Sequence, residues 1–485
     1  MVVGAGLGGL AAACHLVGRG HDVTIVEREE GPGGCASQIV AEGFRIDTGP
    51  VVLTMPEILE ATFAAAGETM IEHVRIRPVD PMYRATFADG SELRVRRGRD
   101  AMTDEIARFA GATEADGFRR FADWLTQLYR VEMPHFIDRN WDSPLDLGRD
   151  LGALVRLLRL GALRRMAGQV ARFFDDERLQ QVFSFQALYA GLSPFEALAV
   201  FCIITYMDSV EGVFFPEGGI HAIARGLVAA ARARGAEVRF GAQIDRIERN
   251  ADGRVSGVRE IGGNRIGADA VVVNVDLAMT YRSLLGIEPP RLVRRGRYSP
   301  SAAVWVAGVD GSMPTGAAHH NIHFAGQWRD SFDALLQGGA RMSDPSILVS
   351  APTVSDPGLA PEGASVVYAL EPVPNLDAGI DWHEEGHRLR DDLVASVGAL
   401  GYPVADPLVE RFIDPLGWQA QGLARGTPFS LAHRFFQSGP FRPRNVDARV
   451  PGLVLTGMGT VPGVGIPMVL LSGALAALRV EELDR

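Results

Sequence analysis

The 485-residue sequence predicts an α/β protein with a Rossmann-type nucleotide-binding domain. Met1-Val2-Val3 is the end of an apolar strand, and it leads through the glycine turn Gly4-Ala5-Gly6-Leu7-Gly8-Gly9 into an alanine-rich helix. In such a GxGxxG turn the first glycine permits the bend, the second lets backbone N–H groups approach a pyrophosphate, and the third lets helix and strand pack closely. We therefore expect Gly4, Gly6 and Gly9 to bind a dinucleotide.

The next strand and a second glycine pair support this prediction. The apolar run over 21–26 ends at Glu27, whose carboxylate can accept hydrogen bonds from an adenosine ribose. Gly33 and Gly34 follow at a spacing that reaches the far side of a bound pyrophosphate. The alternative, an ordinary glycine-rich turn beside a surface acid, is less favoured. NAD and FAD both fit these residues.

Short strands in the middle of the chain predict a second domain with a mixed sheet. Residues 83–87 and 92–96 have the pattern of two strands joined by the turn Asp89-Gly90, and residues 302–309 and 365–370 predict two more strands. We expect this domain to hold the substrate.

Other segments return the chain to the nucleotide-binding domain. A helix over 220–234 ends at Gly235, and residues 237–240 then predict a buried strand. Residues 243–260 predict a hairpin around Asp252-Gly253, and residues 270–274 a further apolar strand.

A chain of this length exceeds one compact core, so we expect discontinuous domains. The expected nucleotide-binding domain comprises residues 1–80, 215–290 and 446–485. The expected substrate domain comprises 81–214, which includes a helical membrane-facing part, and 291–445.

Residues 147–160 predict an amphipathic helix with apolar residues on one side and arginines on the other: Leu151, Leu154, Val155 and Leu158 against Arg149, Arg156 and Arg159. Two interpretations stay open, a helix packed on the core and a helix lying on an anionic membrane surface. No apolar run reaches the roughly 18 residues that a membrane-spanning helix needs, so we expect no spanning segment.

Composition excludes several classes of function. The net charge of -11 and pI near 5.5 argue against a nucleic-acid partner. No lysine occurs, which excludes chemistry through a lysine Schiff base. The cysteines Cys14, Cys35 and Cys202 are scattered without metal-type spacing and fit a reducing cytosol.

Two histidine groups invite a metal-site interpretation that we reject. His383-Glu384-Glu385-Gly386-His387 matches HExxH, but Asp381 and Glu384 form a capping box that opens a helix, and Gly386 is unsuited to a ligand pair within a helix. A second group is expected to be solvated where a strand begins: His319, His320 and His323. We expect no metal.

The stretch Gly43-Phe44-Arg45-Ile46-Asp47-Thr48-Gly49-Pro50 resembles the bacterial-type phytoene desaturases, FAD-dependent carotenoid desaturases of the flavin amine-oxidase superfamily. The resemblance continues through residues 176–188 and Phe215-Pro216-Glu217-Gly218-Gly219 and covers nearly the whole chain. In that family the first stretch lies under the flavin.

The C-terminal stretch favours FAD over NAD. A strand over 453–455 leads into Thr456-Gly457-Met458-Gly459-Thr460-Val461-Pro462-Gly463-Val464-Gly465-Ile466-Pro467 and an apolar helix over 468–478. This loop is similar to the family's GAGTHPGAGIPG, and Rossmann enzymes that bind only NAD lack such a closing element. Further FAD contacts are therefore expected at Arg28, Thr48, Gly49, Ile244, Gly457, Thr460, Gly465, Ile466 and Pro467.

The chain departs from the family loop at two positions. Val461 replaces the family's histidine and Met468 its last glycine, so we expect both to line a reshaped substrate pocket. Asp150 beside Arg149 resembles an Arg-Asp pair of the family and is our candidate catalytic acid or base. An ordinary pair on a helix surface is the alternative.

The resemblance implies an FAD-dependent oxidoreductase that introduces double bonds into a long apolar polyene by hydride transfer to flavin N5. Because carotenoids dissolve only in bilayers, we expect a cytoplasmic protein bound peripherally to the inner face of the cell membrane, with oxygen or a quinone as electron acceptor. A carotenoid oxidase, ketolase or isomerase on this scaffold stays open, as does a non-redox prenyl-lipid carrier of the GDP-dissociation-inhibitor type.

Overall fold

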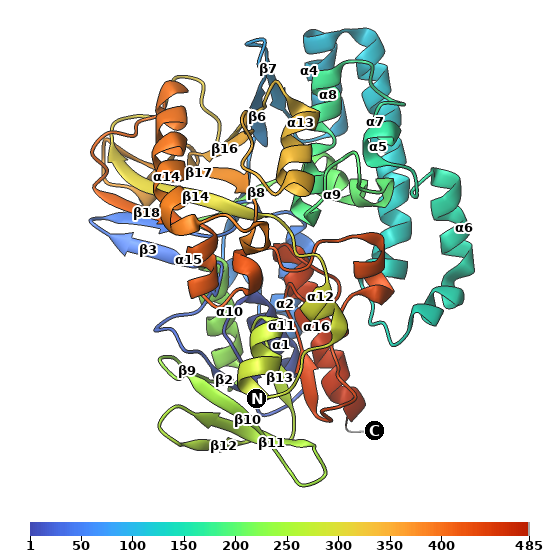
Figure 1. The fold of residues 1–485 in the computed structure, drawn as a ribbon, viewed down its shortest axis with the longest axis vertical. Helices are drawn as coiled ribbons and strands as arrows, with labels where there is room; N and C mark the ends of the chain where they lie inside the picture. The colour runs from blue at the N-terminus through green and yellow to red at the C-terminus, as the bar shows by residue number, and fades with distance from the viewer. Residues whose placement is uncertain (484–485) are drawn as a thin grey trace.

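The computed structural model describes residues 1–483, and two large sheets form its framework (Figure 1). The first sheet has five parallel strands in the order β19-β13-β1-β2-β9. Its strands come from separated stretches of the chain: β1 Val2–Val3, β2 Thr24–Val26, β9 Glu237–Arg239, β13 Val271–Val273 and β19 Leu453–Leu455. This is the parallel arrangement of a Rossmann-type domain, drawn from both ends and the middle of the chain.

Helices α1 Leu7–Gly18, α10 His221–Ala233 and α16 Ile466–Leu483 pack together beside this sheet. A Cβ on Gly8, in the first turn of α1, would lie 3.2 Å from the Val469 carbonyl oxygen in α16. A Cβ on Gly473 would lie 2.5 Å from the Gly8 carbonyl oxygen. The first turns of α1 and α16 therefore lie side by side.

The second sheet is mixed, as predicted, and has seven strands in the order β18-β14-β17-β16-β15-β6-β7. β15 runs parallel to β6, and the other neighbours are antiparallel. The strands are β6 Tyr83–Thr86, β7 Glu92–Val95, β14 Ser301–Asp310, β15 His320–His323, β16 Ile347–Ser350, β17 Ala364–Val373 and β18 Val409–Ile413.

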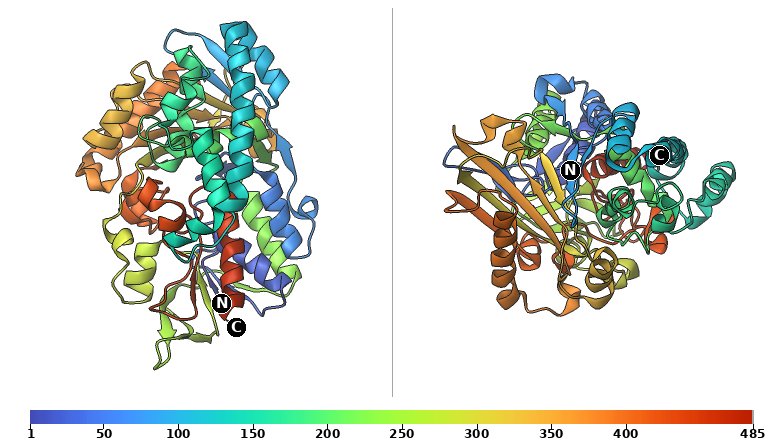
Figure 2. Two further views of the ribbon diagram at one scale, coloured as in Figure 1. Left: turned by 90° about the vertical axis from the view of Figure 1, so that its right-hand side faces the viewer. Right: turned by 90° about the horizontal axis from the view of Figure 1, so that it is seen from above.

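A helical region occupies the side of the molecule opposite this sheet (Figure 2). It comprises α4 Arg99–Ala110, α5 Ala112–Glu132, α6 Leu151–Leu160, α7 Met166–Val170, α8 Glu177–Val182 and α9 Cys202–Tyr206. Its core is aromatic, with the Phe121 ring 5.3 Å from that of Phe174 and 5.5 Å from that of Phe183. Within residues 1–483, no helix combines the length and apolar character needed to cross a bilayer.

Smaller elements complete the fold. A three-stranded antiparallel sheet contains β10 Ile244–Arg249, β11 Val255–Glu260 and β12 Arg265–Gly267. Two further antiparallel pairs are the hairpin of β3 Gln38–Ala41 with β4 Phe44–Asp47, and β5 Ile76–Pro78 with the distant β8 Phe214–Pro216. The remaining α-helices are α2 Pro56–Ala65, α3 Met70–His73, α11 Leu277–Met279, α12 Arg291–Arg295, α13 Trp328–Asp333, α14 Trp382–Ala399 and α15 Pro415–Ala420.

The strand over 237–240 was expected to be buried, and this is wrong. β9 lies at the edge of the parallel sheet, so Glu237 is exposed and Val238 only half-buried. Because β9 has a neighbour on one side only, solvent reaches its side chains from the open edge of the sheet.

The predicted helix over 147–160 also differs. Residues Pro144–Asp150 form a 3₁₀ helix capped by Ser143, and the α-helix begins only at Leu151. Three residues of the expected apolar side are exposed: Leu151 by 62%, Val155 by 43% and Leu158 by 51%. The side that packs inward instead presents Ala153 and Leu157, so the interpretation of a stripe buried on the core is wrong for these three residues.

Candidate active site

A cavity of about 1160 Å³ joins the parallel sheet to the mixed sheet. One end is lined by the turns that follow β1, β2 and β13, which include Gly4, Glu27 and Asn274. The C-terminal ends of parallel strands are where open α/β sheets bind their ligands. The other end is lined mainly by apolar side chains of the mixed sheet and the helical region, among them Phe185, Ile203, Ile322, Phe324, Leu348 and Leu370.

The first glycine turn forms a cradle that side chains would fill. A Cβ on Gly6 would lie 2.5 Å from Asn274 Nδ2, and a Cβ on Gly9 would lie 2.2 Å from the Gly4 carbonyl oxygen. The N-cap residue of α1 is Gly6, so within the described residues no side chain caps the N-terminus of this helix. The N–H groups of the first turn of α1 are therefore free for an anion, and the cradle fits a pyrophosphate.

Glu27 lies in the wall of the same end and is 8% exposed. Its Oε2 accepts from the Ala5 N–H at 2.6 Å and its Oε1 from the Glu29 N–H at 3.0 Å. An ionised carboxylate has about four acceptor sites, so both oxygens can still accept from ribose hydroxyls. The adenosine half of FAD fits this position.

Most of the other predicted cofactor residues line the same cavity: Arg28, Gly33, Gly34, Thr48, Gly49, Ile244, Gly457, Gly465, Ile466 and Pro467. Gly9 and Thr460 do not. Gly9 packs against Gly4, and the Thr460 hydroxyl bonds Ser472 Oγ at 3.0 Å. These two residues support the glycine turns without lining the cavity. Their direct contact with FAD stays a prediction.

Sequence reasoning missed Asn274, which lies between the two glycine loops. A Cβ on Gly457 would lie 2.7 Å from Asn274 Oδ1, just as one on Gly6 would approach Asn274 Nδ2. Asn274 follows β13 directly, so the signal available in the sequence was a polar residue at the end of an apolar strand.

A buried arginine, also missed, holds the C-terminal glycine loop. Arg442 donates from Nε to the Thr460 carbonyl at 2.9 Å and from Nη2 to the Met458 carbonyl at 2.5 Å. Its Nη1 reaches the carbonyls of Leu431 and Gln437 at 3.2 and 3.3 Å. Burial lowers the pKa of Arg442 to about 9. The four partners are backbone atoms from two separate loops, which no local pattern indicates.

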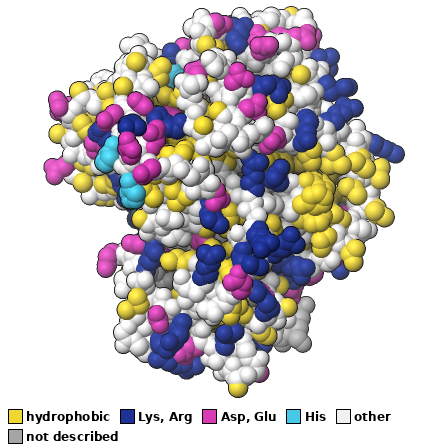
Figure 3. Space-filling view, viewed as in Figure 1, with side chains coloured by type: hydrophobic (Ala, Val, Ile, Leu, Met, Phe, Trp, Pro, Cys, Tyr) yellow, Lys and Arg dark blue, Asp and Glu magenta, His cyan; other side chains and the backbone are white. Residues whose placement is uncertain are grey.

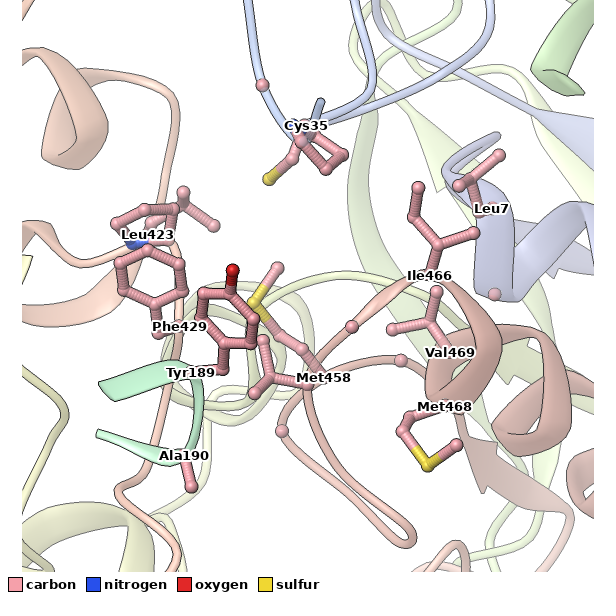
Figure 4. Close-up of a pocket in the computed structure, with 18 of the residues that line it drawn as sticks. Leu7, Cys35, Tyr189, Ala190, Leu423, Phe429, Met458, Ile466, Met468 and Val469 are labelled. Carbon is pink, nitrogen blue, oxygen red and sulfur yellow. The ribbon is translucent and has the colours of Figure 1, made fainter. Parts of the chain in front are cut away.

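Val461 and Met468 both line the cavity, Val461 being 1% exposed. Figure 4 shows Met468 near Ile466 and Val469 of α16, with Met458 and Tyr189 nearer the middle of the pocket. The Cys35 sulfur faces the pocket from the opposite wall (Figure 4). Burial raises the pKa of Cys35 to about 11, so this thiol stays protonated at neutral pH.

Asp150 lies outside the cavity wall described above. Its carboxylate bonds His135 Nδ1 at 3.0 Å and pairs with Arg139, while Arg149 pairs with Asp146. Partial desolvation would raise the pKa of Asp150, but the hydrogen bonds from Arg139 and His135 hold it below the ordinary value. The alternative of an ordinary Arg149-Asp150 surface pair is therefore wrong, and an acid or base role for Asp150 stays a prediction.

The expectation of solvated imidazoles is wrong for His319 and His320, which are each 2% exposed. They face inward where β15 enters the sheet, and their Nδ1 atoms bond Ser355 Oγ at 2.9 Å and Ser350 Oγ at 2.7 Å. Burial lowers the pKa of His319 to about 3.

The HExxH residues begin α14. Asp381 caps this helix by accepting from the His383 N–H at 3.0 Å, as predicted. The predicted capping box is wrong in its second half, because Glu384 pairs with Arg388 instead. Within residues 1–483, no group of three or more His, Cys, Asp or Glu residues is placed to hold a metal ion.

Known proteins share this architecture. A family model described as flavin containing amine oxidoreductase matches residues 7–480. An oxidoreductase from Methanosarcina mazei of known structure superposes with a TM-score of 0.62 at 18% identity, covering 99% of both chains.

Curated relatives are closer in sequence. The phytoene dehydrogenase of Streptomyces griseus is 48% identical over 99% of this chain and 94% of its own length. The zeta-carotene-forming phytoene desaturase of Myxococcus xanthus is 37% identical over 99% and 93%. The glycine cradle, the cavity and these matches agree: the protein is an FAD-dependent oxidoreductase that belongs to the phytoene desaturase family, within the flavin containing amine oxidoreductases.

Proposed function

We propose that the protein is a carotenoid desaturase, which introduces double bonds into a long apolar polyene. The observation that carries this proposal is the cavity, whose glycine-lined end fits FAD and whose far end is largely apolar. A polyene has no polar group to pair with, so an apolar wall is the surface that binds it best. The names of the curated relatives support the same substrate class.

The side chains of this chain would align the polyene and exclude water. Bound FAD supplies a hydride acceptor at its N5 atom. Rings of Phe185, Phe324 and Trp328 meet edge to face, with centroids 5.7 and 5.6 Å apart, and form a stiff wall. A reacting carbon must be held within about 3 to 3.5 Å of its acceptor, so this rigidity supports the reaction.

The alternatives are not favoured. A carotenoid oxidase, ketolase or isomerase, or a prenyl-lipid carrier of the GDP-dissociation-inhibitor type, would fit the scaffold, but the curated relatives at 37–48% identity are named for dehydrogenation or desaturation of phytoene. We propose oxygen or a membrane quinone as the acceptor that takes the electrons after each turnover.

We also propose the cofactor contacts and domain bounds given above. The two sheets support these bounds. The parallel sheet draws its strands from residues 1–80, 215–290 and 446–485, and the mixed sheet draws its strands from 81–214 and 291–445. Val461 and Met468 are proposed to shape the substrate pocket, which their place in the cavity wall supports.

We propose that an exposed apolar patch rests on the inner face of the cell membrane. Its members lie on α6, on the segments beside it and on the turn over 435–441: Leu145, Leu151, Val155, Leu158, Leu163, Phe435 and Phe436. Figure 3 shows hydrophobic side chains gathered on the side where α6 lies, with arginines around them. The segments Pro144–Asp150 and Gly439–Phe441 contact each other, and Leu147 and Phe441 line the cavity. A polyene could therefore pass from the bilayer into the cavity beneath this patch.

Replacing Arg156 and Arg159 by Glu should weaken binding to anionic vesicles at least about 10-fold, because each basic residue at such a surface contributes about 1 kcal/mol. Flotation with vesicles measures this. The control is Arg246→Glu with Arg249→Glu on β10, at the other end of the molecule, which should bind as the wild type does (Figure 1). Equal flotation of all three proteins would contradict the proposed orientation.

The substrate is best tested in cells. Expression in a bacterium supplied in turn with phytoene, neurosporene or a hydroxylated carotenoid should convert phytoene into more desaturated, coloured products, which chromatography separates. Conversion of hydroxylated carotenoids alone would contradict the proposal and favour an oxidase or ketolase.

A further inference from the structure

We propose that Asp208 is the base that takes up a proton from the polyene during desaturation, a role that rests on the proposed function. Asp208 lies on the π-helix Met207–Glu211 that directly continues α9, and it lines the cavity. It is 3% exposed. Its neighbours in the wall include Phe185 and Tyr189, and Figure 4 places Tyr189 in the pocket beside Met458 of the C-terminal glycine loop.

Desaturation needs a proton acceptor as well as a hydride acceptor. A CH₂–CH₂ unit becomes CH=CH by losing one hydrogen from each carbon. One leaves with both electrons of its C–H bond as hydride, which the bound flavin accepts. The other leaves as a proton, and the electrons of its C–H bond form the new π bond. We assign that proton to the Asp208 carboxylate, which becomes a carboxylic acid and releases the proton before the next turnover.

The carboxyl group of Asp208 is held in one orientation. Gln186 Nε2 lies 3.3 Å from Oδ1 and 3.2 Å from Oδ2, and the Ser209 hydroxyl donates to Oδ1 at 2.6 Å. Gln186 is itself fixed, because the Thr205 hydroxyl donates to its Oε1 at 3.2 Å and its amide donates to the Val182 carbonyl. Oδ2 has fewer partners than Oδ1 and is the oxygen available to a substrate.

The surroundings of Asp208 suit a base that works near neutral pH. Burial raises the pKa of its carboxyl to about 7, and the hydrogen bonds from Ser209 and Gln186 limit the rise. The titratable groups that face it are the phenols of Tyr83 and Tyr189, which burial keeps neutral by raising their pKa values. A base with a pKa near the working pH is the most effective.

Two other carboxyl groups are less suited. Glu132 also lines the cavity, but burial raises the pKa of its carboxyl well above the ordinary value, which disfavours the ionised form that accepts a proton. Asp150 is paired with Arg139 and lies outside the wall, as described above. Of these three carboxyl groups, Asp208 is thus the one that both lines the cavity and can accept a proton near neutral pH.

The test compares anaerobic flavin bleaching by phytoene in vesicles for the wild type and Asp208→Asn. We expect the rate to fall at least about 100-fold in Asp208→Asn, the lower range for loss of a general base. Since the carboxylate is the active form, the wild-type rate should rise with pH through about 7. That pH dependence should disappear in the variant. FAD content and the melting temperature should be unchanged, because the Asn amide oxygen can still accept from Gln186.

Two further measurements keep the assignment testable. Difference infrared spectra without substrate should show a carboxyl titrating near pH 7 that Asp208→Asn removes. Gln186→Met removes a hydrogen bond to the carboxylate, so it should raise the pKa and move the rate profile to higher pH. Glu371→Gln is the matched control, since Glu371 is buried with a pKa raised to about 7 but is not among the wall residues of the cavity.

The outcomes separate this role from the proposed function. If no polyene bleaches the wild-type flavin, the proposed function fails. If phytoene bleaches it but Asp208→Asn keeps the rate and its pH dependence, the assignment of Asp208 is overturned. Loss of the rate in Asp150→Asn with Asp208→Asn unaffected would move the role to Asp150.

Discussion

Gly9→Ala is expected to yield protein that lacks FAD. The added Cβ would lie 2.2 Å from the Gly4 carbonyl oxygen and 3.0 Å from Asn274 Cβ. Neither the backbone oxygen nor a Cβ can turn away as the end of a flexible side chain would. The glycine turn must therefore open, and the N–H groups of its cradle move away from the pyrophosphate. Overpacking of this kind costs typically about 1–3 kcal/mol in stability alone, and lost phosphate contacts add to it.

The measurement is the absorbance of the purified protein near 450 nm after dialysis. Gly168→Ala is the control, because Gly168 lies within α7 and a Cβ there would meet nothing within 4 Å. The control should keep its flavin. Normal flavin content in Gly9→Ala would mean that the dinucleotide does not occupy this cradle.

Arg442→Met is the second substitution expected to have a large effect. It leaves the carbonyls of Leu431, Gln437, Met458 and Thr460 without their donor. Each unsatisfied buried acceptor costs about 1–3 kcal/mol, and removal of a buried charge offsets part of this. We expect a net loss of roughly 3 kcal/mol in the free energy of unfolding and a weakened hold on FAD at the C-terminal loop.

Denaturant unfolding of the holoprotein measures this loss. Arg442→Lys should lose nearly as much, because an ammonium group cannot span four carbonyls as the planar guanidinium does. Arg434→Met is the control, since Arg434 is exposed in the same segment. A loss below about 1 kcal/mol in Arg442→Met would show that the loop holds its shape without this clamp.

The parallel sheet and its glycine turns could be predicted because their signals are local. The spacing of Gly4, Gly6 and Gly9 after an apolar strand, and Glu27 at the end of the next, depend on a few neighbouring residues. The mixed sheet was predicted from strand patterns, but its order was not, because β6 lies beside β15, which is more than 200 residues away in sequence.

The rest of the site depends on contacts between distant segments. Asn274, Arg442 and Asp208 act through partners that only the folded chain brings together, such as Gln186 for Asp208. Whether the apolar side of α6 is buried or exposed stayed open between two interpretations, because periodicity identifies an apolar stripe without saying what covers it.

The central claim, that a polyene is oxidised beside FAD in this cavity, is tested most directly by anaerobic titration of the holoprotein with phytoene in vesicles. The account predicts loss of flavin absorbance near 450 nm together with the appearance of one further desaturated product for each flavin reduced. Flavin that stays oxidised with phytoene, and is reduced by an amine instead, would contradict it.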